Sequence, residues 1–229
     1  MKRIISLVLV IAMCLSLAAC GNDKKAFEAS KAAYDKVNVA YEIADQFGSD
    51  IYDVWKAAVY NVDEIKDDDV NYLVNTQGLY LTEEELRDAI AYTFVWFAHP
   101  EGWDEAPEEK KQDYYDNAGS VLRTMANYYK NEFMSFCVTC VTNAYIRSGK
   151  VDIAQAALDD AKVMMKDLSE KYSDYEHYPN LKGYYTTTKS FFDFCQNPTG
   201  SFDQYTNTLN DYKNEARDYI SDLDYIFED

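Results

Sequence analysis

The sequence predicts an all-α protein that folds as an elongated antiparallel bundle of about six helices, two of them long. Three observations lead to this prediction. Glycine (8 residues) and proline (4 residues) are scarce in a chain of 229 residues, which disfavours turn-rich β folds. Apolar residues recur at steps of three and four through most of the chain, as they do on one face of a helix. Several of these periodic stretches begin with recognisable capping residues.

The first periodic stretch starts near Phe27 and reaches Ile65 without a change of phase. Its apolar and small positions are Phe27, Ser30, Tyr34, Val37, Tyr41, Ala44, Gly48, Ile51, Trp55, Ala58, Val62 and Ile65. Such a seam predicts one helix of about 40 residues, roughly 60 Å long. Gly48, followed by Ser49 and Asp50, would instead end one helix and cap another. A break normally resets the phase, so a continuous helix with a neighbour packed closely on Gly48 is the better prediction.

Residues 66–81 combine a run of acids with a glycine and have no clean period, so they are predicted to connect two helices. Thr82 and Glu85 then form a capping box, flanked by Leu81 and Leu86 as a hydrophobic staple. This is the best-marked helix start in the chain.

The helix that follows carries an aromatic cluster of Phe94, Trp96 and Phe97. It is predicted to stop at His99, because Pro100 disfavours helix in the residue before it. From Pro107, a suitable first helical residue, a second long stretch runs to Ser148 and stops at Gly149, and residues 117–120 are its weakest part. The apolar side of this stretch consists of Ala118, Leu122, Met125, Tyr129, Phe133, Phe136, Cys140 and Ala144.

Three more helices are predicted in the rest of the chain. The apolar positions of the fourth are Ile153, Ala157, Ala161, Met164, Leu168 and Tyr172, and those of the fifth are Leu181, Tyr184, Thr188, Phe191 and Cys195. Ser201 and Gln204 form a second capping box. The last helix follows it, with apolar steps of three and four from Phe202 to Ile226.

The first twenty residues have the organisation of a bacterial export signal. Lys2 and Arg3 precede an apolar run, and small residues lead to Cys20. The run is short for a transmembrane helix, which needs about 20 apolar residues. The tetrapeptide LAAC that ends at Cys20 resembles the lipobox of bacterial lipoproteins, and this resemblance covers the signal alone. An ordinary cleaved secretory signal with a chance cysteine is the alternative.

The resemblance implies that Cys20 receives a diacylglyceryl group and becomes the first residue of the mature protein. Residues 1–19 are then a cleaved signal peptide, residues 20–24 a lipidated tether, and residues 25–229 a single helical domain. Two long acyl chains hold a protein on a membrane where one gives only marginal binding. The expected location is the extracytoplasmic face of the cell membrane, with the membrane as a partner through Cys20.

The charge of the chain narrows the range of its partners. It contains 40 acidic and 22 basic residues, a formal net charge of −18. That sign argues against nucleic acid and anionic lipid as binding partners.

The chain's one chemically suggestive cluster is the pair Cys137 and Cys140, which has the spacing of redox and zinc motifs. The pair falls inside a predicted helix, far from the helix N-terminus that would lower a thiol pKa. A structural zinc site needs four ligands, and the other candidates, Cys195, His99 and His177, are scattered. Buried core cysteines are the main prediction; a disulfide with Cys195 and a redox or metal site are the alternatives.

Apart from this cysteine pair, no motif for catalysis, for a cofactor or for a metal is found in the sequence. Asp67, Asp68 and Asp69 lack the glycine and the glutamate that an EF-hand loop places at fixed positions. Among the tryptophans, Trp55 and Trp96 fall on core seams, whereas Trp103 lies in an acidic loop and is expected to be exposed.

The sequence therefore predicts a non-catalytic surface lipoprotein whose bundle is a binding or structural module of the bacterial envelope. A protein or a cationic envelope component is its expected partner. The alternatives to this prediction are a ligand-capturing lipoprotein that serves a transporter and, in third place, an anchored enzyme. The candidate binding segment contains Asp67, Asp68 and Asp69, which would steer a cationic partner, and Tyr72 and Tyr80, which would supply contact area. A solvated linker is the alternative interpretation of this segment.

Overall fold

The computed structural model is all-α, as the sequence predicts. It describes residues 2–60, 81–99, 101–172 and 174–227, with side chains from residue 23 onward. The helices of these residues are α1 (Lys2–Tyr60), α2 (Glu83–Ala98), α3 (Glu108–Asp116), α4 (Ala118–Tyr128), α5 (Lys130–Arg147), α6 (Lys150–Lys171), α7 (Tyr178–Gln196) and α8 (Phe202–Phe227). No strand occurs in the residues described.

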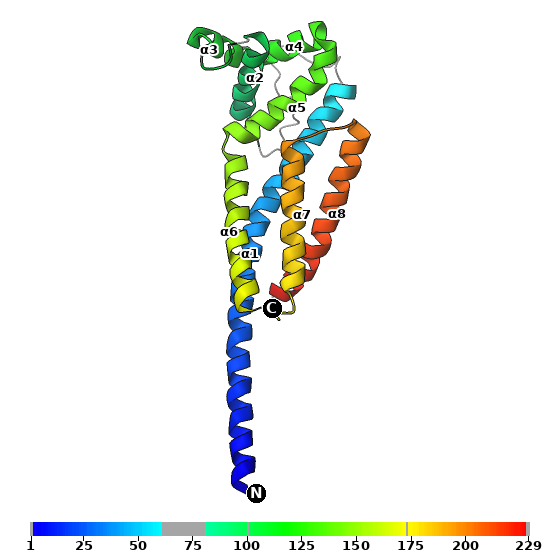
Figure 1. Ribbon diagram of the computed structural model, residues 1–229. Helices are drawn as coiled ribbons and strands as arrows, with labels where there is room; N and C mark the ends of the chain where they lie inside the picture. The colour runs from blue at the N-terminus through cyan, green and yellow to red at the C-terminus, as the bar shows by residue number, and fades with distance from the viewer. Residues whose placement is uncertain (1, 61–80, 100, 173, 228–229) are drawn as a thin grey trace.

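The helices form a long body with a head at one end (Figure 1). In the body, α1 packs against α6, α7 and α8, which run beside it. The head consists of α2, α3 and α4, together with α5, which crosses from the head to the body and also contacts α1. The N-terminal part of α1 extends alone beyond the opposite end of the bundle (Figure 1).

The predicted continuity of the first helix is confirmed, because α1 passes through Gly48 without a break. A Cβ atom on Gly48 would lie 2.7 Å from Cδ1 of Leu209 and 3.1 Å from Cε2 of Phe191. The hydroxyl of Tyr205 donates to the Gly48 carbonyl at 3.1 Å. Glycine is therefore needed here for the close approach of α7 and α8, as the sequence predicts. The predicted seam beyond Tyr60 lies outside the described residues.

Two hydrophobic clusters fill the molecule. The larger joins the second half of α1 to α2, α4 and α5 and to the upper ends of α6, α7 and α8. The smaller lies at the base of the body, where α1, α6, α7 and α8 meet around Tyr34 and Tyr184. At the base, Lys31 Nζ donates to the Phe227 carbonyl at 2.7 Å and the Tyr34 hydroxyl donates to Asp224, so the end of α8 is fastened to α1.

Both predicted capping boxes are present. The Glu85 amide donates to the Thr82 hydroxyl at 3.2 Å, and the Thr82 amide donates to the Glu85 carboxylate at 2.8 Å. The corresponding bonds between Ser201 and Gln204 are 3.2 Å and 2.9 Å long. Each box supplies partners for amide groups that the first turn of a helix leaves unpaired.

The prediction of a single helix from Pro107 to Ser148 is wrong. The chain breaks at Asn117, whose side chain donates to the Asp113 carbonyl at 3.0 Å, and again at Tyr129. Asn117 falls in the segment identified as weak, and its side chain competes with the helical bonding of the backbone. The two breaks raise the helix count from about six to eight in the part of the chain described.

The helices agree only in part with the remaining boundary predictions. The helix α2 ends at Ala98, and Gly149, with a left-handed φ of 76°, separates α5 from α6 as predicted. Residues 20–24, predicted as a tether, are helical as part of α1. None of the helices in the described part of the chain is long and apolar enough to span a membrane.

Candidate functional site

The candidate binding segment of the sequence analysis cannot be placed. Asp67, Asp68, Asp69, Tyr72 and Tyr80 all lie outside the described residues. The lipidation candidate, Cys20, belongs to α1, but its side chain lies outside the described part.

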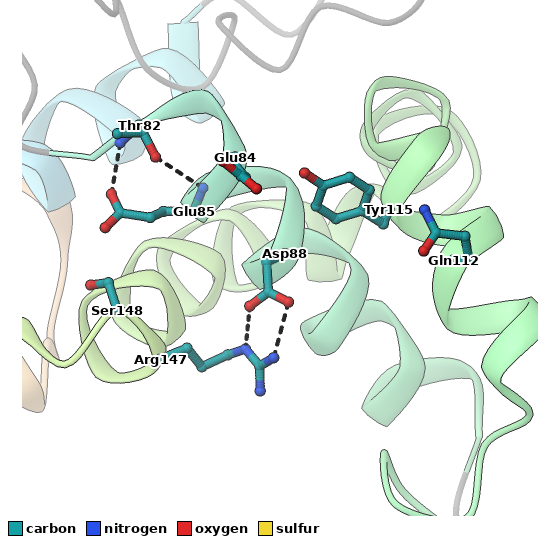
Figure 2. A pocket seen from close by; sticks show the side chains of 8 residues that line it. All are labelled: Thr82, Glu84, Glu85, Asp88, Gln112, Tyr115, Arg147 and Ser148. Carbon is teal, nitrogen blue, oxygen red and sulfur yellow. Dashed lines mark hydrogen bonds and ion pairs between the residues drawn. The ribbon is translucent and has the colours of Figure 1, made fainter.

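The structure instead shows an open pocket at the junction of head and body (Figure 2). It has a volume of about 450 Å³ and lies between the start of α2, the helix α3 and the corner where α5 ends. Its lining residues are Thr82, Glu84, Glu85, Asp88, Gln112, Tyr115, Arg147 and Ser148. All eight lining residues have polar side chains, and they include three carboxylates and one guanidinium. Two of these carboxylates, on Asp88 and Glu85, are already paired with Arg147 and Lys150.

Arg147 is held in this pocket by contacts with three side chains. Its Nε and Nη2 atoms donate to the two oxygens of Asp88 at 2.5 Å and 3.0 Å (Figure 2). Its guanidinium carbon also lies 4.3 Å from the centre of the Tyr92 ring and 5.1 Å from that of Trp103. A bidentate ion pair combined with two cation–π contacts fixes the end of α5 against α2.

A second ion pair fastens α6 to the start of α2. Lys150 Nζ donates to the Glu85 carboxylate, which also closes the capping box with Thr82. Partial burial of Glu85 acts to raise its pKa, but the hydrogen bonds from Lys150 and Thr82 outweigh it and the pKa is lowered. The residues that line this side of the pocket therefore hold the head on the body.

Glu84 and Tyr115 are the lining residues that face each other across the pocket, from α2 and α3 (Figure 2). They also line an adjoining hollow of about 640 Å³, together with Glu83, Arg87 and Asp116. Burial and the nearby Glu84 carboxylate raise the pKa of Tyr115, so the phenol stays protonated at neutral pH. The surface here is acidic, and no group of His, Cys, Asp and Glu side chains among the described residues is arranged to hold a metal ion.

A buried carboxyl lies behind this junction, on α1. Asp50 is fully buried, and it accepts hydrogen bonds from the Tyr145 hydroxyl at 2.6 Å and from Gln46 Nε2 at 2.9 Å. The Tyr145 ring stacks on Phe47, with the ring centres 4.1 Å apart. Burial raises the pKa of Asp50 to about 6, against the two hydrogen bonds, which lower it. This link between α1 and α5 was missed from the sequence, because Asp50 lies off the predicted seam.

The three thiols are packing groups, as the main prediction has it. Cys137, Cys140 and Cys195 are free and buried. Burial raises the pKa of each thiol, which keeps all three protonated and unreactive. The Cys195 thiol donates to the Ala44 carbonyl at 3.4 Å and so belongs to the contact of α7 with α1.

The tryptophan predictions hold for only one of the three residues. Trp55 is buried, as predicted, and its indole N–H lies 2.9 Å from the Met134 sulfur, beside a further pocket of about 500 Å³. Trp96 was predicted in the core but is exposed. Trp103 is half-buried rather than exposed, because Tyr92, Arg147 and Lys111 pack on its ring.

Comparison of the chain with protein-family models, with curated proteins and with solved structures found no match.

Proposed function

We propose that the chain is a lipid-anchored protein of the extracytoplasmic face of a bacterial cell membrane and that its helical bundle is a non-catalytic binding module. The observation that carries this proposal is the closeness of two features. The LAAC tetrapeptide ends at Cys20, and the first buried residue of the body, Ala26, follows six residues later. A lipid on Cys20 therefore holds the folded body directly at the bilayer surface.

The arrangement of the helices suits a module that presents its head away from the membrane. From Ala26 to Tyr60, α1 rises about 50 Å at 1.5 Å per residue. The head lies at the far end of that rise, and the end of α8 lies at the base (Figure 1). The net charge of −18 opposes contact of the body with anionic lipid, which favours an upright orientation.

Two features favour binding over catalysis. The buried thiols have raised pKa values, and the guanidinium of Arg147 donates to both oxygens of Asp88 and packs on the rings of Tyr92 and Trp103. The three pockets described above are open to the surface, whereas a ligand-capturing receptor encloses most of its ligand.

The anchor is tested by metabolic labelling with a fatty-acid analogue in a bacterium that processes lipoproteins. We expect the wild type to be labelled and to sediment with membranes, and Cys20→Ala to lose the label and retain residues 1–19. Cys14→Ala, which removes the neighbouring cysteine of the signal, is the matched control and should be labelled like the wild type. Equal labelling of the wild type and Cys20→Ala contradicts the proposal.

A further inference from the structure

Four exposed aromatic side chains lie on the head, two consecutive residues at the end of α2 and two at the break between α4 and α5. The exposed fractions are 52% for Trp96, 42% for Phe97, 81% for Tyr128 and 41% for Tyr129. We call these four residues the aromatic tip. The rings of Phe97 and Tyr129 make an edge contact, with their centres 5.0 Å apart, so the tip joins α2 to the break between α4 and α5.

The aromatic tip is where the sequence pattern and the structure disagree. Trp96 and Tyr129 fall on apolar seams that predict burial, yet both are exposed. The neighbours of Tyr129 on the same seam, Met125 and Phe133, are buried as predicted, so the disagreement is confined to the break. Positions where a locally consistent pattern fails are often functional, and clustered exposed apolar side chains mark interaction sites.

The ring of Trp96 is held in place on its inner side. Gly102 has a left-handed φ of 88°, and a Cβ atom there would lie 2.6 Å from the Trp96 ring. The indole therefore rests on the backbone of the loop, where only glycine leaves room. Tyr92 contacts Trp96 with ring centres 6.3 Å apart and is itself fixed by Arg147. A ring ordered before binding loses less conformational entropy when a partner arrives.

The loop beneath Trp96 is strongly acidic. Residues 101–109 contain five acids and no base: Glu101, Asp104, Glu105, Glu108 and Glu109. Glu101 is paired with His99 and Glu108 with Lys111, whereas the side chains of Asp104, Glu105 and Glu109 are exposed. Over residues 82–117 there are eleven acids and three bases, a net charge of −8. Lys130, beside Tyr129, is the one base next to the tip in sequence.

We infer that the aromatic tip is a docking surface for a partner protein that presents lysine or arginine side chains around an apolar residue. The exposed indole and phenol rings accept cations on their faces, and the acids of the loop attract the same cations from a distance. An interface hot spot usually has aromatic side chains at its centre and charged side chains around them. This inference rests on the proposed function only for the direction in which the tip faces, away from the bilayer.

The probe for this surface is a short synthetic peptide of lysine and serine with leucine at its centre. Its counterpart has glutamate in place of each lysine. The full chain, in a non-ionic detergent, is titrated against each labelled peptide at low and at high salt, and binding is followed by fluorescence anisotropy. We expect the lysine peptide to bind, the glutamate peptide not to bind, and the affinity to fall as salt rises.

Variants then locate the binding. Trp96→Ala should weaken binding of the lysine peptide by about fivefold or more, whereas Tyr225→Ala, at an exposed tyrosine of α8, should change it less than about twofold. The triple change Asp104→Asn, Glu105→Gln and Glu109→Gln should weaken binding most at low salt. The matched control replaces three exposed acids of α8: Asp203→Asn, Asp211→Asn and Asp222→Asn. Both triple variants alter the net charge equally, so only the position of the acids differs.

Three results would overturn the inference: no binding of the lysine peptide by the wild type, equal binding of the two peptides, or equal loss in the two triple variants. All the altered side chains are exposed, so we expect each variant to keep the fold. The thermal melting temperature of each variant checks this. The anchor is judged separately, since Cys20→Ala in detergent should bind the lysine peptide like the wild type even though it lacks the lipid.

Discussion

At the scale of single residues, Asp50 is a carboxyl that burial shifts away from its usual titration range. Its carboxyl is buried between α1 and α5, near Lys150 of α6 and Asp53 of its own helix. Lys150 lowers its pKa and Asp53 raises it, but burial is the largest influence. Two donors, Tyr145 and Gln46, hold this side chain. The carboxyl accepts hydrogen bonds from them whether it is ionised or protonated.

Replacement of Asp50 by asparagine should change how stability depends on pH. The folded pKa is raised from 3.8 to about 6, so the folded state binds the proton more tightly than the unfolded state. The stabilisation that this proton brings is complete below pH ~4 and is lost as pH rises to ~6, a loss of up to about 3 kcal/mol. We therefore expect Asp50→Asn to be more stable than the wild type at pH ~7.5 and similar to it at pH ~4.

Denaturant unfolding of the wild type and of Asp50→Asn across this pH range gives the difference between their free energies of unfolding. The other carboxyl groups contribute almost equally to the two proteins, so their contributions largely cancel in this difference. Tyr145→Phe is the companion variant. It leaves the buried carboxyl with one donor fewer, so it should destabilise the protein, and most strongly at the higher pH. If the difference between Asp50→Asn and the wild type does not vary with pH, the carboxyl titrates alike in the folded and unfolded states.

At the scale of the helices, the close contact at Gly48 decides how α7 and α8 approach α1. Gly48→Val would place side-chain atoms where Leu209 and Phe191 already lie, and overpacking of a core costs about 1–3 kcal/mol. Ala32→Val, at an exposed position of the same helix, measures the effect of a valine that meets no neighbour. Valine is a poorer helix former than alanine and a better one than glycine, so without the contact Gly48→Val would be the milder change. We expect it instead to lower the free energy of unfolding by about 1–2 kcal/mol more than the control does. If Gly48→Val is the milder change in chemical denaturation, the contact has no cost.

The helix starts that carry capping residues can be predicted from the sequence. A helix break that has no capping residue cannot. Thr82 with Glu85 and Ser201 with Gln204 were identified because the capping residue types and their spacing are local properties. The break at Tyr129 has no such signal, since the apolar steps of three and four continue through it. When the chain changes direction and the apolar steps of three and four continue, the periodicity of the sequence does not reveal the break.

The site residues were hidden from the sequence for a related reason. Arg147 meets Asp88, Tyr92 and Trp103 only because α5 crosses α2, and that crossing depends on the break at Tyr129. Trp96 falls on an apolar seam that predicts burial, whereas the head leaves the end of α2 uncovered. The sequence pattern shows which residues lie on the apolar face of a helix. Which of these residues are buried depends on how the helices pack against one another.

At the scale of the whole molecule, the three tryptophans provide a test of orientation. Trp55, Trp96 and Trp103 all lie in the head or at the upper end of α1. Along α1, Trp55 is about 50 Å from Cys20. In vesicles that contain spin-labelled lipids, we expect the intrinsic emission of the anchored protein to be quenched little. The indole added by Lys25→Trp, at the base of the body, should be quenched strongly, and equal quenching of both would mean that the bundle lies flat on the bilayer.

The single long helix also determines how the molecule would respond to mechanical load. Cys20 and the head are joined through α1, and α6, α7 and α8 lie along its length (Figure 1). With the proposed anchor and partner, a pull between the partner and the lipid would act parallel to these interfaces and load them in shear, so that many side-chain contacts would resist at the same time. A pull across the bundle would instead peel the helices apart one contact after another. The direction of α1 therefore makes the body stiff along the line on which an anchored binding protein is pulled.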